Sequence, residues 1–377
     1  MYKQTIYKQA ITLLQDYLSS LGFQAQIHFE LEGCYTTTQT NTKHKLDLTS
    51  INQQLNKLNI DGEIVNEYWR NQWEFVSLFN GQSPLEEADN LNQAMSVLPY
   101  IFAQYGIEKT LIKPVVWSGD KGKLAAGAKE IFTDETRAVH IPNAVQLNVS
   151  VLNNAGENII AQHFFGECLQ QCFLQTSKAC SLLYLPEEDA FERLKLKSTY
   201  GLAAELCSPS DLSGGHQGSI ALYKKHGKHN QMMGAEPVLY DHKHNVLLSR
   251  NNWQKTARIE HRLGASSPFY NPYINVLFAL ANVVDAIGIY QNRLCKSSLV
   301  SNSSPEALPS SLYTVNGQLG AIDLFSQDAW FSQCINSVQE KSSIIGITKA
   351  LDYPLHLGDK IKQQYLDNYQ SDRLITL

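Results

Sequence analysis

Carboxylate and guanidinium side chains recur at alternate positions in segments that lie far apart in the sequence. Residues 23–33 and 257–263 alternate between apolar and polar side chains, which predicts strands with one polar face. Two shorter strands are expected at residues 63–69 and 73–78. The charged side chains on these predicted strands are Glu30, Glu32, Glu67, Glu74, Arg258, Glu260 and Arg262.

Several carboxylates on neighbouring strands repel one another unless cations neutralise them. Oxygen ligands favour magnesium or manganese, and guanidinium groups form a planar fork that matches phosphate oxygens. Metal ions beside arginines are typical of phosphoryl transfer, which depends on positioning and charge neutralisation. For any single strand, a polar face that is merely solvated explains the pattern equally well. Its repetition on several strands favours a site for divalent cations and a nucleotide.

The segments between these strands carry the signals of helices. Ser83, Pro84 and Glu86 have the spacing of a capping box with proline at the first helical position, which predicts a helix that ends near Gly106. The other expected elements are helices at 3–20, 159–183 and 274–289, a polar loop at 36–50 and a strand at 145–152. Strands with one apolar face predict an α+β fold, in which helices cover one face of a curved antiparallel sheet.

The composition is that of one large globular unit. Hydrophobic residues make up 43% of the 377, enough for a sizeable core. We therefore expect a single catalytic-type domain over residues 1–377, with an N-terminal helix at 1–20 and a helical C-terminal portion at 274–377. The 31 basic and 36 acidic residues give a net charge of −5 without any basic block, which argues against nucleic acid as a partner.

The apolar runs and the cysteines of the sequence indicate the cellular compartment in which the protein is expected. No run of about 18 apolar residues and no signal-peptide pattern is found, so we expect a cytoplasmic protein without a membrane partner. The seven cysteines are irregularly spaced and do not indicate a disulfide framework. Cys168 and Cys172, four residues apart on an expected helix, are predicted to be packed thiols.

The motifs on the predicted strands resemble those of glutamine synthetases. The segment Arg258-Ile-Glu260-His-Arg262, followed nine residues later by Asn271-Pro272-Tyr273, is similar to the R-I-E-x-R…N-P-Y block of that family. Residues 67–75 resemble its E-x-x-x-G-Q-W-E-F strand pair, and residues 29–32 resemble its E-x-E strand. Shorter similarities lie at residues 88–89, 112–114 and 308–312, so the resemblance is discontinuous but extends over most of the chain.

This resemblance implies a glutamine-synthetase-like catalytic domain whose active site is the polar, concave face of the sheet. It also implies ATP as co-substrate and two sites for Mg²⁺ or Mn²⁺. The implied metal ligands are Glu32, Glu67 and Glu74 for the first site and Glu30, Glu260 and Gln146 for the second. The implied nucleotide-binding residues are Lys255, Arg258 and Ser150, and the implied catalytic residues are Arg258, Arg262 and Arg193, the last of these beside the substrate carboxylate.

The sequence departs from the family pattern at four places. Where the family has H-x-H-x-S, this chain has Gln146-Leu-Asn148-Val-Ser150, so the second metal would meet an amide. The family's N-R-x-x-x-x-R segment has no counterpart near residues 216–219, where Lys224 and Lys225 either compensate or are solvated. Thr199 lies where the flap glutamate is expected, and only a helix precedes the E-x-E strand in place of the usual small N-terminal β domain.

Two functions from different classes are consistent with this pattern. The first is an ATP- and metal-dependent carboxylate–amine ligase that forms a γ-glutamyl amide or a related amide through an acyl phosphate. Its partners would be a small amino acid or amine, and the resemblance is compatible with a homo-oligomer. The second is a catalytically degenerate relative that binds nucleotide and metal as a regulator or scaffold. The retained carboxylates favour the ligase, because clustered carboxylates without a cation are destabilising.

Overall fold

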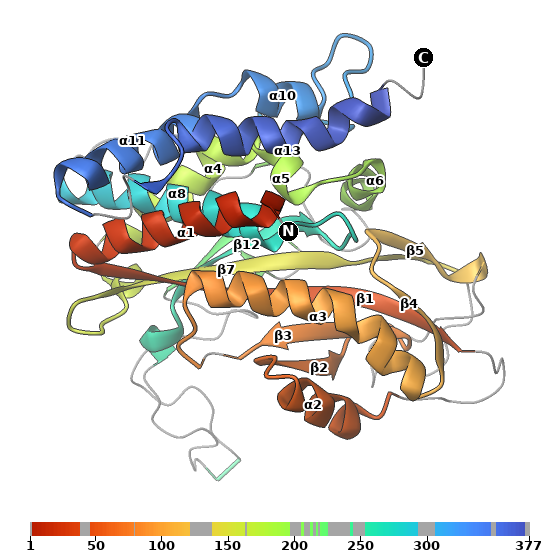
Figure 1. Ribbon diagram of the computed structural model, residues 1–377. Helices are drawn as coiled ribbons and strands as arrows, with labels where there is room; N and C mark the ends of the chain where they lie inside the picture. Colours follow the sequence, from red (N-terminus) through yellow and green to blue (C-terminus); the bar gives the residue numbers. More distant parts are fainter. Residues whose placement is uncertain are drawn as a thin grey trace.

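A seven-stranded sheet forms the centre of the computed structural model (Figure 1), and all its strand pairs are antiparallel. Its strands, in spatial order, are β11 (Ile220–Tyr223), β12 (Arg258–Ala265), β7 (Ala144–Asn153), β1 (Phe23–Thr37), β3 (Gln72–Ser77) and β2 (Gly62–Asn66). A seventh strand, β4 (Ile107–Leu111), pairs with the C-terminal end of β1. The structure describes residues 2–37, 46–78, 80–120, 138–162, 164–196, 205–206, 212–213, 216–217, 219–224, 242–243, 253–292, 306–347 and 352–373.

Three two-stranded ladders accompany the main sheet. They pair β9 with β10 (Leu212–Ser213 and His216–Gln217), β8 with β13 (Glu205–Leu206 and Glu306–Ala307), and β5 with β6 (Val115–Trp117 and His140–Pro142). All three are too short to have been predicted from alternation, which needs four or more residues.

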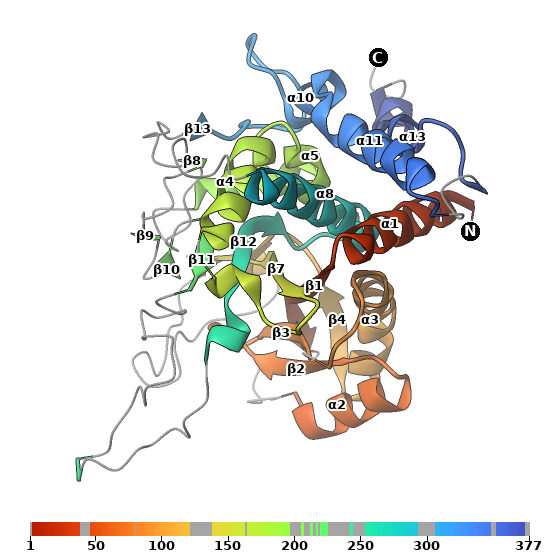
Figure 2. The same cartoon turned by 90° about the vertical axis from the view of Figure 1, so that its left-hand side faces the viewer.

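Helices cover one face of the sheet. In Figure 1, α1 (Tyr2–Ser20), α8 (Pro272–Gln291) and α4 (Phe165–Ser177) lie over it, with α10 (Ala321–Gln327), α11 (Trp330–Ile344) and α13 (Leu357–Arg373) stacked above them. Figure 2 shows α3 (Pro84–Gln104) beside β1 and near the end of α1. The shorter helices are α2 (Leu48–Lys57), α5 (Ser181–Tyr184) and α6 (Glu188–Lys195). The predicted α+β class, with an antiparallel sheet and helices on one face, is confirmed.

Strand alternation separates the core from the opposite face of the sheet. Ile27, Phe29 and Leu31 of β1 are fully buried in the main hydrophobic core, as are Trp73 and Phe75 of β3. Because successive side chains on a strand point to opposite faces, the residues between them lie on the other side of the sheet. Glu30, Glu32 and Glu74 therefore share the face that the helices leave uncovered.

Two of the predicted helices are confirmed in detail. α1 covers the range expected from its apolar spacing, and Lys8 on it lies within ion-pairing distance of Asp89 on α3. α3 begins with the predicted capping box: the Ser83 hydroxyl accepts from the amide of Glu86, whose carboxylate accepts from the amide of Ser83. The helix ends before Gly106, whose φ of 81° is strained for residues other than glycine.

α8 is the one described helix that is long and apolar enough to cross a membrane. Of its most apolar stretch, 72% is buried inside the protein, between α1, α3, α4 and α11. Such burial is expected of the central helix of a globular core, which is apolar on all sides.

Two expectations are wrong. The loop expected at 36–50 is shorter at both ends, because β1 extends to Thr37 and α2 begins at Leu48, capped by the side chain of Asp47. Residues 38–45 lie outside the described residues. Cys168 is disulfide-bonded, whereas Cys172 is a free buried thiol. The four-residue spacing of Cys168 and Cys172 on α4 does not show whether either of them pairs with another cysteine.

Candidate functional site

The register of the sheet brings the predicted ligands from distant segments onto four adjacent strands. Residues directly opposite one another in an antiparallel pair share a face, with Cβ atoms about 4.5–5.5 Å apart. The opposing pairs on this face are Glu32 with Glu74, Glu30 with Gln146, and Glu260 with Asn148. The sequence segments that carry these residues thus meet in one row across β12, β7, β1 and β3.

Glu67 lies at the hairpin that joins β2 to β3. Its backbone amide donates to the carbonyl of Gln72 (3.3 Å), which places it two residues from Glu74 along the neighbouring strand. Among the residues that the structure describes, no three His, Cys, Asp or Glu side chains are grouped closely enough to hold a metal ion. The backbone therefore aligns the three carboxylates of the predicted first site, and their side chains would have to turn toward one another to share a cation.

Glu32 is held from the side of β7. Its Oε2 accepts from the amide of Ala144 (2.7 Å) and its Oε1 from Nε2 of Gln146 (3.4 Å). The Gln146 side chain is buried, and its Oε1 has no hydrogen-bond partner among the described residues. A buried amide oxygen without a hydrogen-bond partner is the kind of ligand that a hard cation accepts, so the chemistry of Gln146 fits Mg²⁺ or Mn²⁺.

Glu260 is surrounded by positive charge. It is fully buried on β12, and its Oε2 accepts from Nη2 of Arg258 at 3.0 Å. Its Oε1 lies 3.6 Å from Nε of Arg262. Both predicted arginines therefore meet the predicted metal ligand that lies between them in the sequence.

Asn148 connects this cluster to β1. Its Oδ1 accepts from Nε of Arg258 (2.7 Å), and its Nδ2 donates to Oε1 of Glu30 (3.0 Å). The guanidinium of Arg258 also lies over the ring of Tyr223, 4.8 Å from its centroid. Neither Asn148 nor Tyr223 was predicted as a site residue. Asn148 has the same alternation as Gln146, which could have identified it, whereas nothing in the sequence pairs Tyr223 with Arg258.

Arg193 anchors α6 to β12. The side chain is 2% exposed, and its Nη1 and Nη2 donate to the carbonyls of Leu263 and Arg262, both at 3.3 Å. Burial lowers the pKa of Arg193 to about 10, against the nearby carboxylate of Glu32, which raises it. The predicted contact of Arg193 with a substrate carboxylate stays a prediction, because its guanidinium is engaged with backbone oxygens here.

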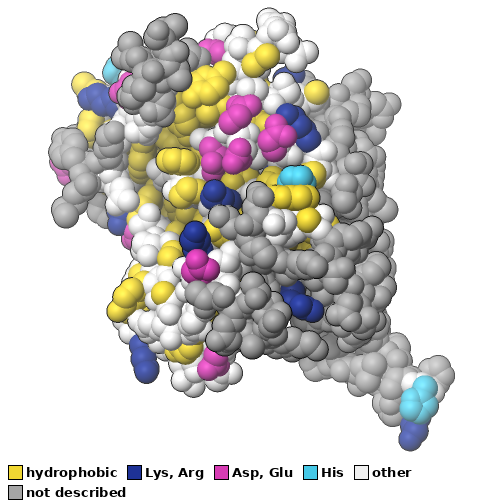
Figure 3. Space-filling model, turned by 90° about the vertical axis from the view of Figure 1, so that its right-hand side faces the viewer, with side chains coloured by type: hydrophobic (Ala, Val, Ile, Leu, Met, Phe, Trp, Pro, Cys, Tyr) yellow, Lys and Arg dark blue, Asp and Glu magenta, His cyan; other side chains and the backbone are white. Residues whose placement is uncertain are grey.

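The outer surface of α6 carries acidic side chains, in contrast to its buried side. Glu188, Asp189 and Glu192 are exposed there, and the carboxylate of Glu188 accepts from the amide of Leu312 at 2.8 Å. Figure 3 shows the side of the molecule on which α6 lies, where acidic side chains gather in one area with basic side chains beside them. The contact with Leu312 ties the helix to the segment at 308–312.

Besides Arg258, two residues were predicted to bind the nucleotide, Ser150 and Lys255. Ser150 is buried on β7 and donates to Oε1 of Gln26 (3.3 Å), and Lys255 is exposed in the 3-10 turn Trp253–Thr256 that precedes β12. Lys224, one of the two lysines considered as replacements for the family's arginines, instead pairs with Glu167 of α4 at 3.0 Å. Lys225 lies outside the described residues.

A buried histidine and a buried glutamate meet near the same row. His28 of β1 is opposite Asn148 in the register, and its Nδ1 lies 3.8 Å from Oε1 of Glu87 on α3. Burial raises the pKa of Glu87 to about 8 and lowers the pKa of His28 to about 4, with the charge of Arg258 adding to the lowering. Both side chains are therefore neutral at pH 7, and neither was predicted from the sequence.

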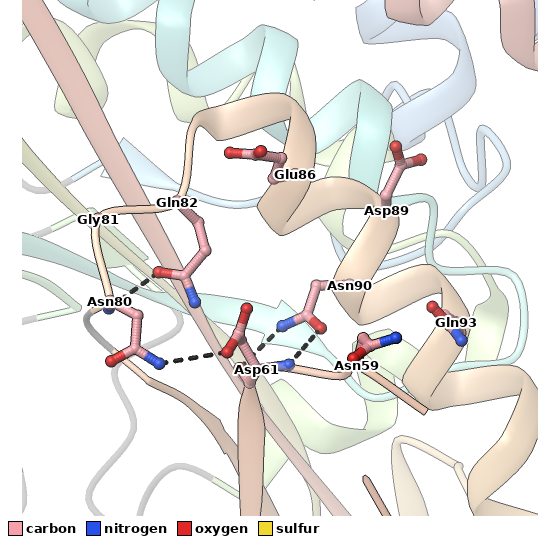
Figure 4. A pocket seen from close by; sticks show the side chains of 9 residues that line it. All are labelled: Asn59, Asp61, Asn80, Gly81, Gln82, Glu86, Asp89, Asn90 and Gln93. Carbon is pink, nitrogen blue, oxygen red and sulfur yellow. Dashed lines mark hydrogen bonds between the residues drawn. The ribbon is translucent and has the colours of Figure 1, made fainter. Parts of the chain in front are cut away.

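A separate polar hollow of about 460 Å³ lies between the start of α3 and the ends of β2 and β3 (Figure 4). Its walls are held by amides: the side chain of Asn90 bonds both the amide and the carbonyl of Asp61, and Gln82 accepts from the amide of Asn80. These contacts fix the helix to the hairpin. The hollow contains none of the predicted site residues.

The architecture and the row of carboxylates, amides and arginines define a glutamine-synthetase-like fold, which confirms the predicted resemblance. No family model matches the sequence, and a search of curated proteins finds no match. A solved structure described as a novel glutamine synthase homolog is similar at a TM-score of 0.57 and 14% identity, over 95% of this chain and 75% of that one.

Two structures of GmaS are similar as well. The ligand-free form gives a TM-score of 0.54 and the ADP complex 0.57, each at 12% identity over 97% of this chain and 74% of GmaS. At such low identity the likeness concerns the fold.

Proposed function

We propose that this protein is an ATP- and divalent-metal-dependent ligase that joins a carboxylate to an amine and forms a γ-glutamyl amide or a related amide. The observation that carries the proposal is the register that aligns Glu32 with Glu74 and sets Glu260 between Arg258 and Arg262. The likeness to a GmaS structure in complex with ADP supports a nucleotide as the ligand of this face.

The reaction would proceed in two group transfers. A carboxylate oxygen of the acid attacks the γ-phosphorus of ATP, and the bond to the bridging oxygen breaks, which gives an acyl phosphate and ADP. The amine nitrogen then attacks the acyl carbon, phosphate leaves, and the nitrogen loses a proton as the amide forms. A cation held by Glu32, Glu67 and Glu74 would neutralise phosphate charge.

The residues of this chain would position the reactants and balance their charge. Arg258 and Arg262 line the row beside Glu260, so their guanidinium groups would meet the phosphoryl oxygens as negative charge moves between them. Arg258 is pre-oriented by Asn148 and by the ring of Tyr223. A fixed donor needs little reorganisation when the phosphoryl group moves, which is what such catalysis requires.

The test measures binding first and turnover second. MnCl₂ should raise the thermal midpoint of the protein, and ADP should raise it further, because ligands that bind the native state stabilise it. ADP release is then measured with ATP, glutamate and ammonia, methylamine or ethylamine. Glu74→Gln should lose the response to Mn²⁺ and the turnover, whereas Glu108→Gln, an exposed carboxylate on β4, should keep both. No midpoint shift with Mn²⁺ or ADP would refute the proposal.

The regulator or scaffold remains the second candidate, and Gln146 favours it, because an amide stands where the family has a histidine ligand. The two candidates differ in turnover. Stabilisation by Mn²⁺ and ADP without ADP release for any acid and amine of the panel would support the scaffold.

A further inference from the structure

The bulge of β12 places two residues of that strand opposite one residue of β7. The ladder between the two strands is regular up to His261 and resumes at Gly264. Arg262 and Leu263 therefore both lie across from Gln146. A bulge disrupts the ladder, and buried backbone groups that leave a ladder need other hydrogen-bond partners. The conformation of the bulge, and with it the direction of the Arg262 side chain, depends on groups outside this ladder.

Arg193 of α6 supplies hydrogen bonds to the bulge. Its Nη1 donates to the carbonyl of Leu263 and its Nη2 to the carbonyl of Arg262, both at 3.3 Å. A guanidinium presents its donors in a fixed plane, and hydrogen bonds from a charged donor are stronger than those between neutral groups. A third bond comes from the residue before β11, because the carbonyl of Ser219 accepts from the amide of Arg262 at 3.0 Å. The backbone of Arg262 is thus held on both sides.

The burial of Arg193 favours this backbone role over contact with a bound substrate. Its side chain is 2% exposed, and its Nε is buried as well, without a partner among the described residues. A substrate carboxylate could reach the guanidinium only if α6 moved or if a bond to the bulge were given up. Giving up such a bond is unfavourable, because a buried carbonyl that loses its donor destabilises the fold.

α6 is anchored at its other end by a separate contact. Oε2 of Glu188, in the first turn, accepts from the amide of Leu312 at 2.8 Å and from the hydroxyl of Ser311 at 3.0 Å. Arg193 lies in the last turn, so the two contacts hold opposite ends of one helix. Loosening of α6 and loss of the bulge contact can therefore be separated by experiment.

We infer that Arg193 is a positioning residue, whose guanidinium fixes the bulge of β12 and thereby aims the side chain of Arg262 toward Glu260. Nε of Arg262 lies 3.6 Å from Oε1 of Glu260 in this arrangement. The inference deepens the proposed function and rests on it for the chemistry that Arg262 performs. It gives Arg193 a role different from the contact with a substrate carboxylate that the family resemblance implies. The effect of Arg193 on the reaction should then pass through Arg262, and the acid should bind equally well without it.

The first test compares ADP release in Arg193→Lys, Arg262→Lys and the double variant, with ATP, glutamate and the most active amine of the panel. Lysine keeps the charge and loses the fork that bonds both carbonyls. Arg193→Lys should lower kcat about tenfold, less than the roughly 10²-fold loss when a preorganised donor itself is removed, and leave KM for glutamate within about twofold. In the Arg262→Lys background the same change should lower kcat less than about twofold, because residues that act as a unit are not additive.

Glu188→Ala is the matched control, because it removes the other anchor of α6. It should leave kcat within about twofold of the wild type, since the bulge keeps its guanidinium. A loss of kcat as large as that of Arg193→Lys would show that docking of α6 is what matters and would overturn the inference. The inference also fails if Arg193→Lys raises KM for glutamate at constant kcat, changes neither constant, or lowers kcat equally in both backgrounds.

Hydrogen exchange separates this inference from the proposed function, because it needs no turnover. The amides of residues 260–265 should exchange faster in Arg193→Lys than in the wild type and at the wild-type rate in Glu188→Ala. Unchanged exchange in Arg193→Lys would overturn the inference whatever the turnover. If the wild type releases no ADP and the exchange result still holds, the proposed function fails while Arg193 keeps its place at the bulge. Should Arg193→Lys not fold, Arg193→Gln, whose amide can still donate to one carbonyl, replaces it in both tests.

Discussion

Glu87→Gln gives a test of the buried pair near the site, because Glu87 is fully buried and its neighbours are known. It faces Nδ1 of His28 from β1 at 3.8 Å and Ser77 from β3, and the carboxylates of Asp61 and Glu86 add to the rise of its pKa. Burial raises that pKa to about 8, whereas an unfolded glutamate titrates near about 4.3.

A carboxyl whose folded pKa lies above its unfolded pKa contributes stability that is complete below the unfolded value and is lost as the pH rises through the folded value. Between pH 5 and 7 the folded wild type holds one proton that the unfolded chain releases. Its unfolding free energy should therefore fall by about 1.4 kcal/mol per pH unit relative to Glu87→Gln, or about 3 kcal/mol over this range.

The assay is urea unfolding of the wild type and Glu87→Gln at pH 5, 6, 7 and 8, with Glu63→Gln, an exposed carboxylate on β2, as the control. His28 has a folded pKa of about 4, so it contributes stability that is lost as the pH falls from about 6.5 toward 4. Because all three proteins contain His28, its contribution cancels in the differences between their unfolding free energies. A constant difference between wild type and Glu87→Gln from pH 5 to pH 8 would show that the carboxyl is ionised in the fold.

The other predictions concern the elements that position the site, and each is measured by urea unfolding. Ser83→Ala should cost about 1 kcal/mol, because it removes the capping bond at the start of α3. Gly264→Ala should cost about 1–3 kcal/mol, since a Cβ there would lie 2.4 Å from a carbonyl oxygen of β7, whereas Gly288→Ala, with open space on α8, should stabilise by about 0.5–1 kcal/mol. Lys8→Met should cost no more than about 1 kcal/mol, because its partner Asp89 is half-exposed.

The elements that the sequence predicted well have strong local signals. β1, β7 and β12 alternate over seven or more residues, so their two faces follow directly from the pattern. α3 is specified by its capping box and by its glycine stop. For these elements the local preference and the tertiary packing agree, and the row of site residues is therefore largely readable from the sequence.

Elements with weak local signals were missed. α2 is mostly polar and buries only Ile51 and Leu55, so it lacks a full apolar stripe. The N-cap signal of Asp47 followed by Ser50 could nevertheless have revealed the helix. The contacts of Arg258 with Tyr223 and of His28 with Glu87 join elements that lie far apart in the sequence. No spacing rule within one segment contains that information.

The bulge in β12 explains how the fold brings the charged cluster together. The pairing of β12 with β7 shifts register between His261 and Gly264, and a bulge bends its strand and re-aims the side chains beside it. The amide of Arg262 bonds the carbonyl of Ser219, outside the β11–β12 register pairs, while its side chain remains near Glu260. Gly264 lacks the Cβ that would clash with β7, so β12 can pack against β7 beside the bulge. The loss of stability expected for Gly264→Ala should therefore be accompanied by altered Mn²⁺ binding or turnover if the bulge orients Arg262, and by neither if it only fits the strand to its neighbour.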